Sequence, residues 1–144
     1  MAIKTGTFEY TDSQDSMCEQ DDFVLRVPGG IRSKAELLAA LASAGRFPDY
    51  FGGNWDALQD CLRDLSWISN RKVVIMHSDL PLHDSPAECR TYLEILQTAL
   101  AEWAESVKPN AAEPPPEWSY VDHELRVVFP TEAKAAVARL VART

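Results

Sequence analysis

The chain has 144 residues, of which 46% are hydrophobic and 25% charged, and its formal net charge is −8. This composition predicts a globular protein with its own core, and the negative charge disfavours direct binding of nucleic acid, whose phosphates would be repelled. No apolar run approaches the roughly 18 residues of a membrane span and no signal peptide opens the chain, so we expect a soluble protein of the reducing cytoplasm. The three cysteines form no C-x-x-C pair and predict neither a disulfide framework nor a zinc site.

Residues 1–21 are mostly polar and form an N-terminal arm. Residues 5–10 alternate enough to predict a short edge strand with Phe8 and Tyr10 on one face. In a loose arm these two aromatic side chains would be exposed to solvent. We therefore expect the arm to be partly docked on the rest of the chain.

A strand and a helix follow the arm. The apolar run Phe23–Val27 is closed by a Pro-Gly-Gly turn and predicts a strand. Ser33 predicts the N-cap of a helix over residues 34–44, and Gly45 is expected to end it.

Residues 47–68 carry the most informative pattern of the chain. Pro48 fixes its own backbone and disfavours a helical Phe47, which predicts a constrained aromatic loop. Gly52 and Gly53 permit positive φ angles. Asn54 is a favoured N-cap residue, so a short helix is expected to begin directly after it.

This short helix has two sharply different halves. At 100° per residue the apolar half contains Trp55, Leu58, Cys61, Leu62 and Leu65. The opposite half contains Asp56, Asp60 and Asp64, with Gln59 and Arg63 beside them. Like charges one turn apart cost roughly 0.2–0.5 kcal/mol per pair, and the helix dipole offsets this only in the first turn. An acidic half is often merely solvated, but this one is also suited to receive a basic surface.

Four further segments complete the predicted fold. Residues 72–76 form a nearly continuous apolar run that predicts a strand buried on both faces. Ser85 and Pro86 open a longer helix to about residue 107, whose buried stripe is Tyr92, Leu93, Leu96, Leu100 and Trp103. Residues 108–117 contain four prolines and predict a stiff loop. Residues 125–129 predict the last strand and residues 131–142 a terminal amphipathic helix.

The order of these elements predicts the fold class. Strands that alternate with helices are joined by helical crossovers, which makes neighbouring strands parallel. We therefore expect an α/β protein with a small three-stranded parallel sheet and helices packed on it. A single domain would comprise the arm (residues 1–21), a core (residues 22–129) and a C-terminal helix (residues 130–144).

The sequence gives only weak evidence for metal-binding or catalytic groups. His77, His83 and His123 have Asp79 and Asp84 close to the first two, but no ligand spacing such as H-x-x-x-H occurs. Cys61 lies on the apolar half of its helix, which predicts a packed, inert thiol. We expect no metal, no cofactor and no enzymatic activity.

The uninterrupted run PDYFGGNWDALQDCL, residues 48–62, resembles the signature segment of the barstar family, intracellular inhibitors of the ribonuclease barnase. An aromatic pair, a glycine, an asparagine and then D-A-L-x-D-C-L occur in that family at the same spacing. Beyond this run the resemblance covers residues 22–129 as an order of elements. It implies the barstar fold and a bacterial ribonuclease inhibitor, in the manner of an immunity protein or antitoxin.

The resemblance also implies which residues bind the partner, namely Tyr50, Phe51, Gly52, Gly53, Asn54, Asp56, Gln59 and Asp60. Asp60 would be the central anchor, its carboxylate standing in for an RNA phosphate. A further carboxylate comes from the helix before the last strand, here Glu102 or Glu105. The chain departs from the family at Gln59, where an aromatic residue is usual, and at Trp55, where a small one is, so its partner can differ from barnase.

The expected partner is a basic ribonuclease or toxin of the barnase type, bound by a protein that is monomeric when free. Neither nucleic acid nor membrane is expected to bind directly. The alternative is an interaction module of the same fold for a partner that is not a nuclease.

Overall fold

The computed structural model of the chain describes residues 8–13, 20–47, 53–65, 67–106 and 123–141. Its elements in chain order are β1 (Glu9–Thr11), β2 (Phe23–Val27), α1 (Lys34–Gly45), α2 (Trp55–Asp64), β3 (Lys72–His77), α3 (Pro86–Ser106), β4 (Glu124–Pro130), the 3-10 helix η2 (Thr131–Ala133) and α4 (Lys134–Val141). Among these described helices, none is both long enough and apolar enough to cross a bilayer.

The sheet has four strands in the order β1-β4-β3-β2, and all neighbouring pairs are parallel. Leu25, Ile75 and Val127 lie in register across its three core strands. The parallel α/β fold is thus confirmed, but the sheet has one strand more than the three expected. The additional strand is β1 of the arm, which pairs with the free edge of β4 through Tyr10 opposite Phe129.

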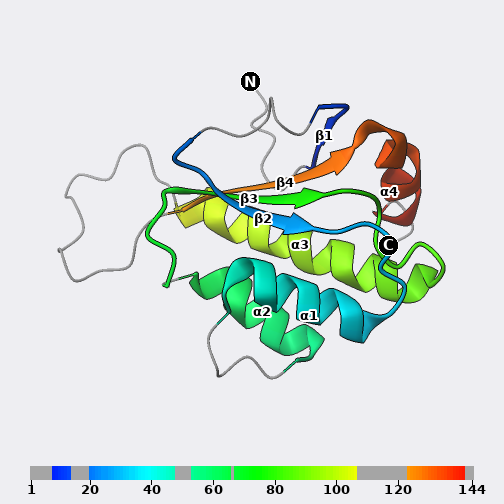
Figure 1. Cartoon of the computed structure of the whole chain (residues 1–144), viewed down its shortest axis with the longest axis horizontal. Coiled ribbons are helices and arrows are strands. Elements are labelled where there is room, and N and C mark those ends of the chain that lie inside the picture. Colours follow the sequence, from blue (N-terminus) through cyan, green and yellow to red (C-terminus); the bar gives the residue numbers. More distant parts are fainter. Residues whose placement is uncertain (1–7, 14–19, 48–52, 66, 107–122, 142–144) are drawn as a thin grey trace.

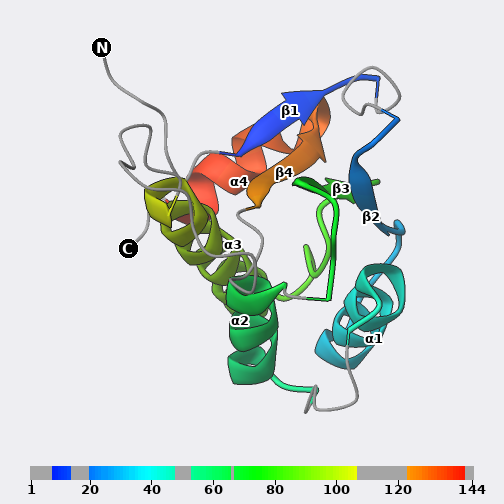
Figure 2. The same ribbon diagram turned by 90° about the vertical axis from the view of Figure 1, so that its left-hand side faces the viewer.

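The helices pack on one face of the sheet. In the view of Figure 1, α3 runs directly beneath the strands, and α1 and α2 lie below α3; Figure 2 shows the molecule from the left-hand side of that view. Alternate strand residues, such as Ile75 and Val127, join the main core with Leu37, Leu58 and Leu93 of the first three helices. The predicted buried stripe of α3 is confirmed, because all five of its side chains are buried. The opposite face of the sheet carries the smaller buried cluster Val74, Met76 and Val128.

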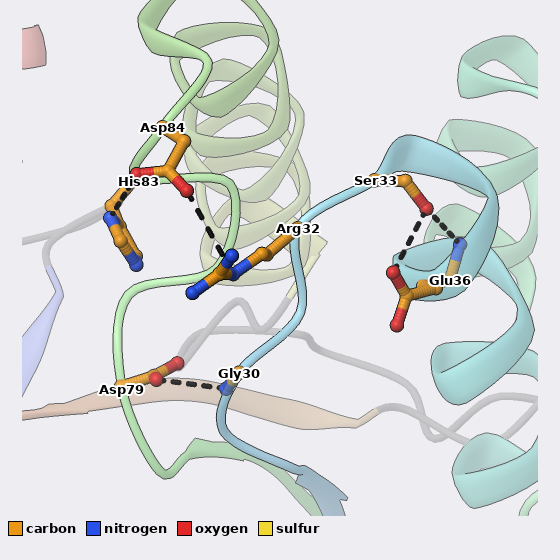
Figure 3. Close-up of polar contacts among 7 residues, drawn as sticks. All are labelled: Gly30, Arg32, Ser33, Glu36, Asp79, His83 and Asp84. Carbon is orange, nitrogen blue, oxygen red and sulfur yellow. Dashed lines mark hydrogen bonds and ion pairs between the residues drawn. The ribbon is translucent and has the colours of Figure 1, made fainter.

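The ends of α1 confirm one predicted signal and correct another. The Ser33 hydroxyl oxygen accepts a hydrogen bond from the backbone N–H of Glu36, as expected of an N-cap (Figure 3). At the other end the left-handed residue is Arg46 (φ 53°), and Gly45 is the last helical residue. A Cβ on Gly45 would lie 2.7 Å from Leu25 Cδ1. A side chain at this position would crowd the core, so packing rather than the φ angle favours glycine there.

The C-terminal part agrees with the sequence in outline. The last strand is one residue longer at each end than predicted, and the terminal helix is divided into η2 and α4. Residues 108–117, the predicted stiff loop, lie outside the described residues.

The docking expected of the arm is confirmed for its described part. Phe8 is buried, and its ring centroid lies 5.3 Å from that of Phe129 in an edge-on contact, while Tyr10 stacks on the same ring at 6.4 Å. On the other face of the sheet, the Arg126 guanidinium donates to both carboxylate oxygens of Glu9, at 2.8 Å and 2.6 Å. The hydrogen bond with Glu9 raises the pKa of Arg126.

We expect Glu9→Gln to lower the free energy of unfolding by about 1 kcal/mol, because it replaces a bidentate charged pair with a neutral contact. Urea unfolding of the full chain measures this value. Glu124→Gln is the matched control, since Glu124 is exposed two residues from Arg126 on the same strand. Equal losses in the two variants would show that the bidentate contact contributes nothing beyond a general effect of charge.

Candidate functional site

The start of α2 has the geometry that the sequence predicts. Gly53 has a φ of +71°, a conformation that favours glycine. Asn54 is extended (φ −136°), and its side-chain Oδ1 accepts a hydrogen bond of 2.7 Å from the backbone N–H of Ala57. The helix therefore begins at Trp55, as expected. Tyr50, Phe51 and Gly52, three of the expected partner-binding residues, lie outside the described residues.

We expect Asn54→Ala to destabilise the protein by about 1 kcal/mol, because it leaves the N–H of Ala57 without its capping acceptor. Thermal or urea unfolding measures the loss. Asn54→Ser is the control, since a serine hydroxyl can accept the same hydrogen bond and most of the stability should remain. If both variants lose the same amount, the cap contributes nothing to stability.

The two halves of α2 are divided as predicted. Leu58, Cys61 and Leu62 are buried, whereas Asp56 and Asp60 are exposed and Gln59 is half-buried. Within the described part of the chain, the carboxylates of Asp56 and Asp60 form no ion pair and no hydrogen bond. We call Asp56, Asp60 and Asp64 the acidic face. The first two of its carboxylates are open to an external cation.

The C-terminal end of α2 is fixed by side chains from other elements. The indole N–H of Trp103 on α3 donates to the carbonyl oxygen of Leu62 at 2.7 Å. Nε2 of the buried His123 lies 2.9 Å from the carbonyl oxygen of Leu65, and Nδ1 lies 2.8 Å from that of Asn70. The last carbonyls of a helix lack partners within the helix. The Trp103 indole satisfies that of Leu62, and the His123 ring, wedged between the carbonyls of Leu65 and Asn70 and able to donate to one of them when neutral, packs the end of α2 against the core.

Two cationic side chains, Lys34 of α1 and Arg63 of α2, make contacts that sequence reasoning did not predict. The Lys34 ammonium lies 5.3 Å from the ring centroid of Trp55, which stacks in turn on Tyr92 at 6.4 Å. Arg63 forms an ion pair of 2.8 Å, from its Nε to Oε2 of Glu102 on α3. The helical period placed Arg63 beside the aspartates, but nothing local in the sequence could identify its partner 39 positions away.

The histidines are placed in separate environments. His77 is completely buried, with Nε2 2.7 Å from the Tyr92 hydroxyl and Nδ1 3.0 Å from the carbonyl oxygen of Val128. Burial lowers the pKa of His77 to about 4. His83 is exposed beside Asp84 at 3.0 Å (Figure 3). No group of three potential metal ligands occurs among the described side chains.

Polar contacts at the carboxyl ends of β2 and β3 close the adjoining loops. The backbone N–H of Gly30 donates to Oδ2 of Asp79 at 3.0 Å, and Arg32 lies 3.9 Å from Asp84 (Figure 3). These two carboxylates therefore connect one loop to the other. These contacts give both aspartates a structural role, while Oδ1 of Asp79 is buried without a hydrogen-bond partner in the described part of the chain.

Cys61 is placed as the sequence predicts. Its side chain is 1% exposed on the inner half of α2. Burial, and then the charges of Asp64 and Asp60, raise the pKa of this thiol to about 11. Since the thiolate is the reactive form, the group is unsuited to nucleophilic chemistry.

Comparison with known proteins gives one match. A protein-family model described as Barstar (barnase inhibitor) matches residues 23–113, from the first residue of β2 to beyond α3. Searches of curated proteins and of solved structures gave no significant match.

Proposed function

The chain belongs to the barstar family, and we propose that it inhibits a basic ribonuclease by inserting the start of α2 and its acidic face into the catalytic cleft. The partner-binding residues in this proposal are Tyr50, Phe51, Gly52, Gly53, Asn54, Asp56, Gln59 and Asp60. Inhibition would be steric and electrostatic, with no chemical step performed by this chain.

The exposure of the Asp56 and Asp60 carboxylates is the observation that carries the proposal. A ribonuclease binds RNA phosphates with lysine and arginine side chains, and a carboxylate accepts the same charge-assisted hydrogen bonds. Had these two side chains been buried, or paired with internal cations, they could not serve a partner. Their exposure supports an external role, and the net charge of −8 favours rapid association with a basic protein.

The fixed position of α2 gives a second reason. A helix that is capped by Asn54 and held at its far end by Trp103 and His123 does not have to be ordered when the partner arrives. Ordering costs reduce binding free energy, so a rigid acidic helix binds more tightly than the same residues in a loose loop.

Capture from an extract of the native cells, followed by an RNA-cleavage assay, tests the proposal. We expect the wild-type chain to retain a basic ribonuclease and to abolish its cleavage of a fluorogenic RNA, and Asp60→Ala to retain and inhibit the same enzyme much less. Gln59 stands where the family has an aromatic residue, so barnase should be assayed beside the captured enzyme. Retention of a protein without ribonuclease activity, equally by wild type and Asp60→Ala, would instead indicate an interaction module for another class of partner.

A further inference from the structure

Arg63 is the only basic residue of α2, whose sequence from Trp55 to Asp64 also contains three aspartates. It follows Asp60 by three positions, and side chains three apart on a helix are neighbours. Asp60 is therefore an available partner for the Arg63 guanidinium within the same helix. A pair between them would occupy the carboxylate that the proposed function requires to be open.

The structure pairs Arg63 differently. Its Nε lies 2.8 Å from Oε2 of Glu102, and the Asp60 carboxylate remains exposed, without an ion pair in the described part of the chain. A hydrogen bond between the neighbouring residues holds α2 and α3 together beside this contact. Trp103, the neighbour of Glu102, donates its indole N–H to the carbonyl of Leu62, the neighbour of Arg63, at 2.7 Å. Glu102 is thus held where it can reach the guanidinium.

We propose that Glu102 is a positioning residue, which draws Arg63 away from Asp60 and neutralises it, so that the acidic face presents an unpaired carboxylate to a cationic partner. The effect on partner binding rests on the proposed function, whereas the contact between Arg63 and Glu102 does not depend on it. It assigns to Glu102 an indirect role through Arg63, whereas the resemblance to the family implies a carboxylate that touches the partner itself.

A double-mutant cycle with barnase and with the captured ribonuclease separates the two roles. Glu102→Gln should weaken binding about two- to fivefold, the range of an exposed ion pair, because Arg63 becomes available to Asp60. In an Arg63→Gln background the same change should have no further effect. Glu88→Gln, which removes one negative charge near the start of the same helix, is the control for steering and should leave the dissociation rate unchanged.

Two outcomes would overturn the inference. If Glu102→Gln weakens binding equally with and without Arg63, Glu102 contacts the partner directly. If it has no effect in either background, Arg63 does not compete for Asp60.

A measurement on the free protein keeps the inference separate from the proposed function. In the wild type, Asp60→Asn should leave the NMR resonance of the Arg63 Nε–H unchanged, because Glu102 holds that group. In the Glu102→Gln variant, Asp60→Asn should shift the resonance. If Asp60→Asn leaves the Arg63 resonance unchanged in both backgrounds, the positioning role is contradicted. Failure of the wild-type chain to bind any ribonuclease, with the resonance behaving as expected, would contradict the proposed function alone.

Discussion

Asp60→Ala is expected to weaken binding to the ribonuclease partner by roughly 2–5 kcal/mol, the range of hot-spot residues in desolvated interfaces. The barnase–barstar interface is itself a known case of such hot spots, so this magnitude belongs to the class of interface. The reason for the loss is the cationic site of the partner. In the complex of the Asp60→Ala variant, the partner's lysine and arginine side chains at this position would be buried away from water without a counter-charge. Titration calorimetry or inhibition of RNA cleavage measures the change.

Two variants separate this anchoring role from a general loss of negative charge. Asp56→Ala should weaken binding by less, because Asp56 lies nearer to the start of the helix. Asp12→Ala removes the same charge from an exposed site after β1, at the sheet edge opposite to β2. It should reduce only the association rate, and only at low salt. Equal affinities of wild type and Asp60→Ala would contradict the insertion of α2 into a catalytic cleft.

The sequence predicted best those features that are determined by near neighbours in the chain. Ser33 and Asn54 cap their helices as expected because an N-cap bond joins residues three apart. The apolar run from Lys72 to Met76 predicted a buried strand correctly, because a strand in the centre of a parallel sheet is covered on both faces. The pairing of β1 with β4 could not be predicted in the same way, since it joins Tyr10 to Phe129 across almost the whole chain.

The site shows the same division between local and distant features. The helical period predicted that Asp56 and Asp60 share an exposed half with Arg63, and the structure bears out the two exposed aspartates. The helical period could not predict that Glu102 pairs with Arg63, because that contact depends on how α3 packs against α2. Which of these residues bind a partner stays a prediction, carried by the family resemblance and by exposure.

His77 is expected to make the protein sensitive to mild acid. Its neutral ring donates from Nδ1 to the Val128 carbonyl and accepts from the Tyr92 hydroxyl at Nε2. Burial lowers its pKa from 6.5 to about 4, so protonation favours the unfolded chain. The stability that depends on a neutral His77 is fully present above pH 6.5 and is lost as the pH falls from 6.5 to 4. The loss amounts to roughly 3 kcal/mol.

A protonated Nε2 could no longer accept from Tyr92, the ring on which Trp55 stacks at the start of α2. Protonation of His77 should therefore also weaken the packing of Trp55 at the start of α2. Urea unfolding from pH 7 to pH 4 measures the loss of stability. The difference in stability between wild type and His77→Gln, whose amide does not titrate, should change by roughly 3 kcal/mol over this range. His83→Gln, which makes the same change at an exposed histidine, is the matched control. A constant difference for His77→Gln would mean that His77 has the same pKa in the folded protein as in the unfolded chain, and would contradict the lowering by burial.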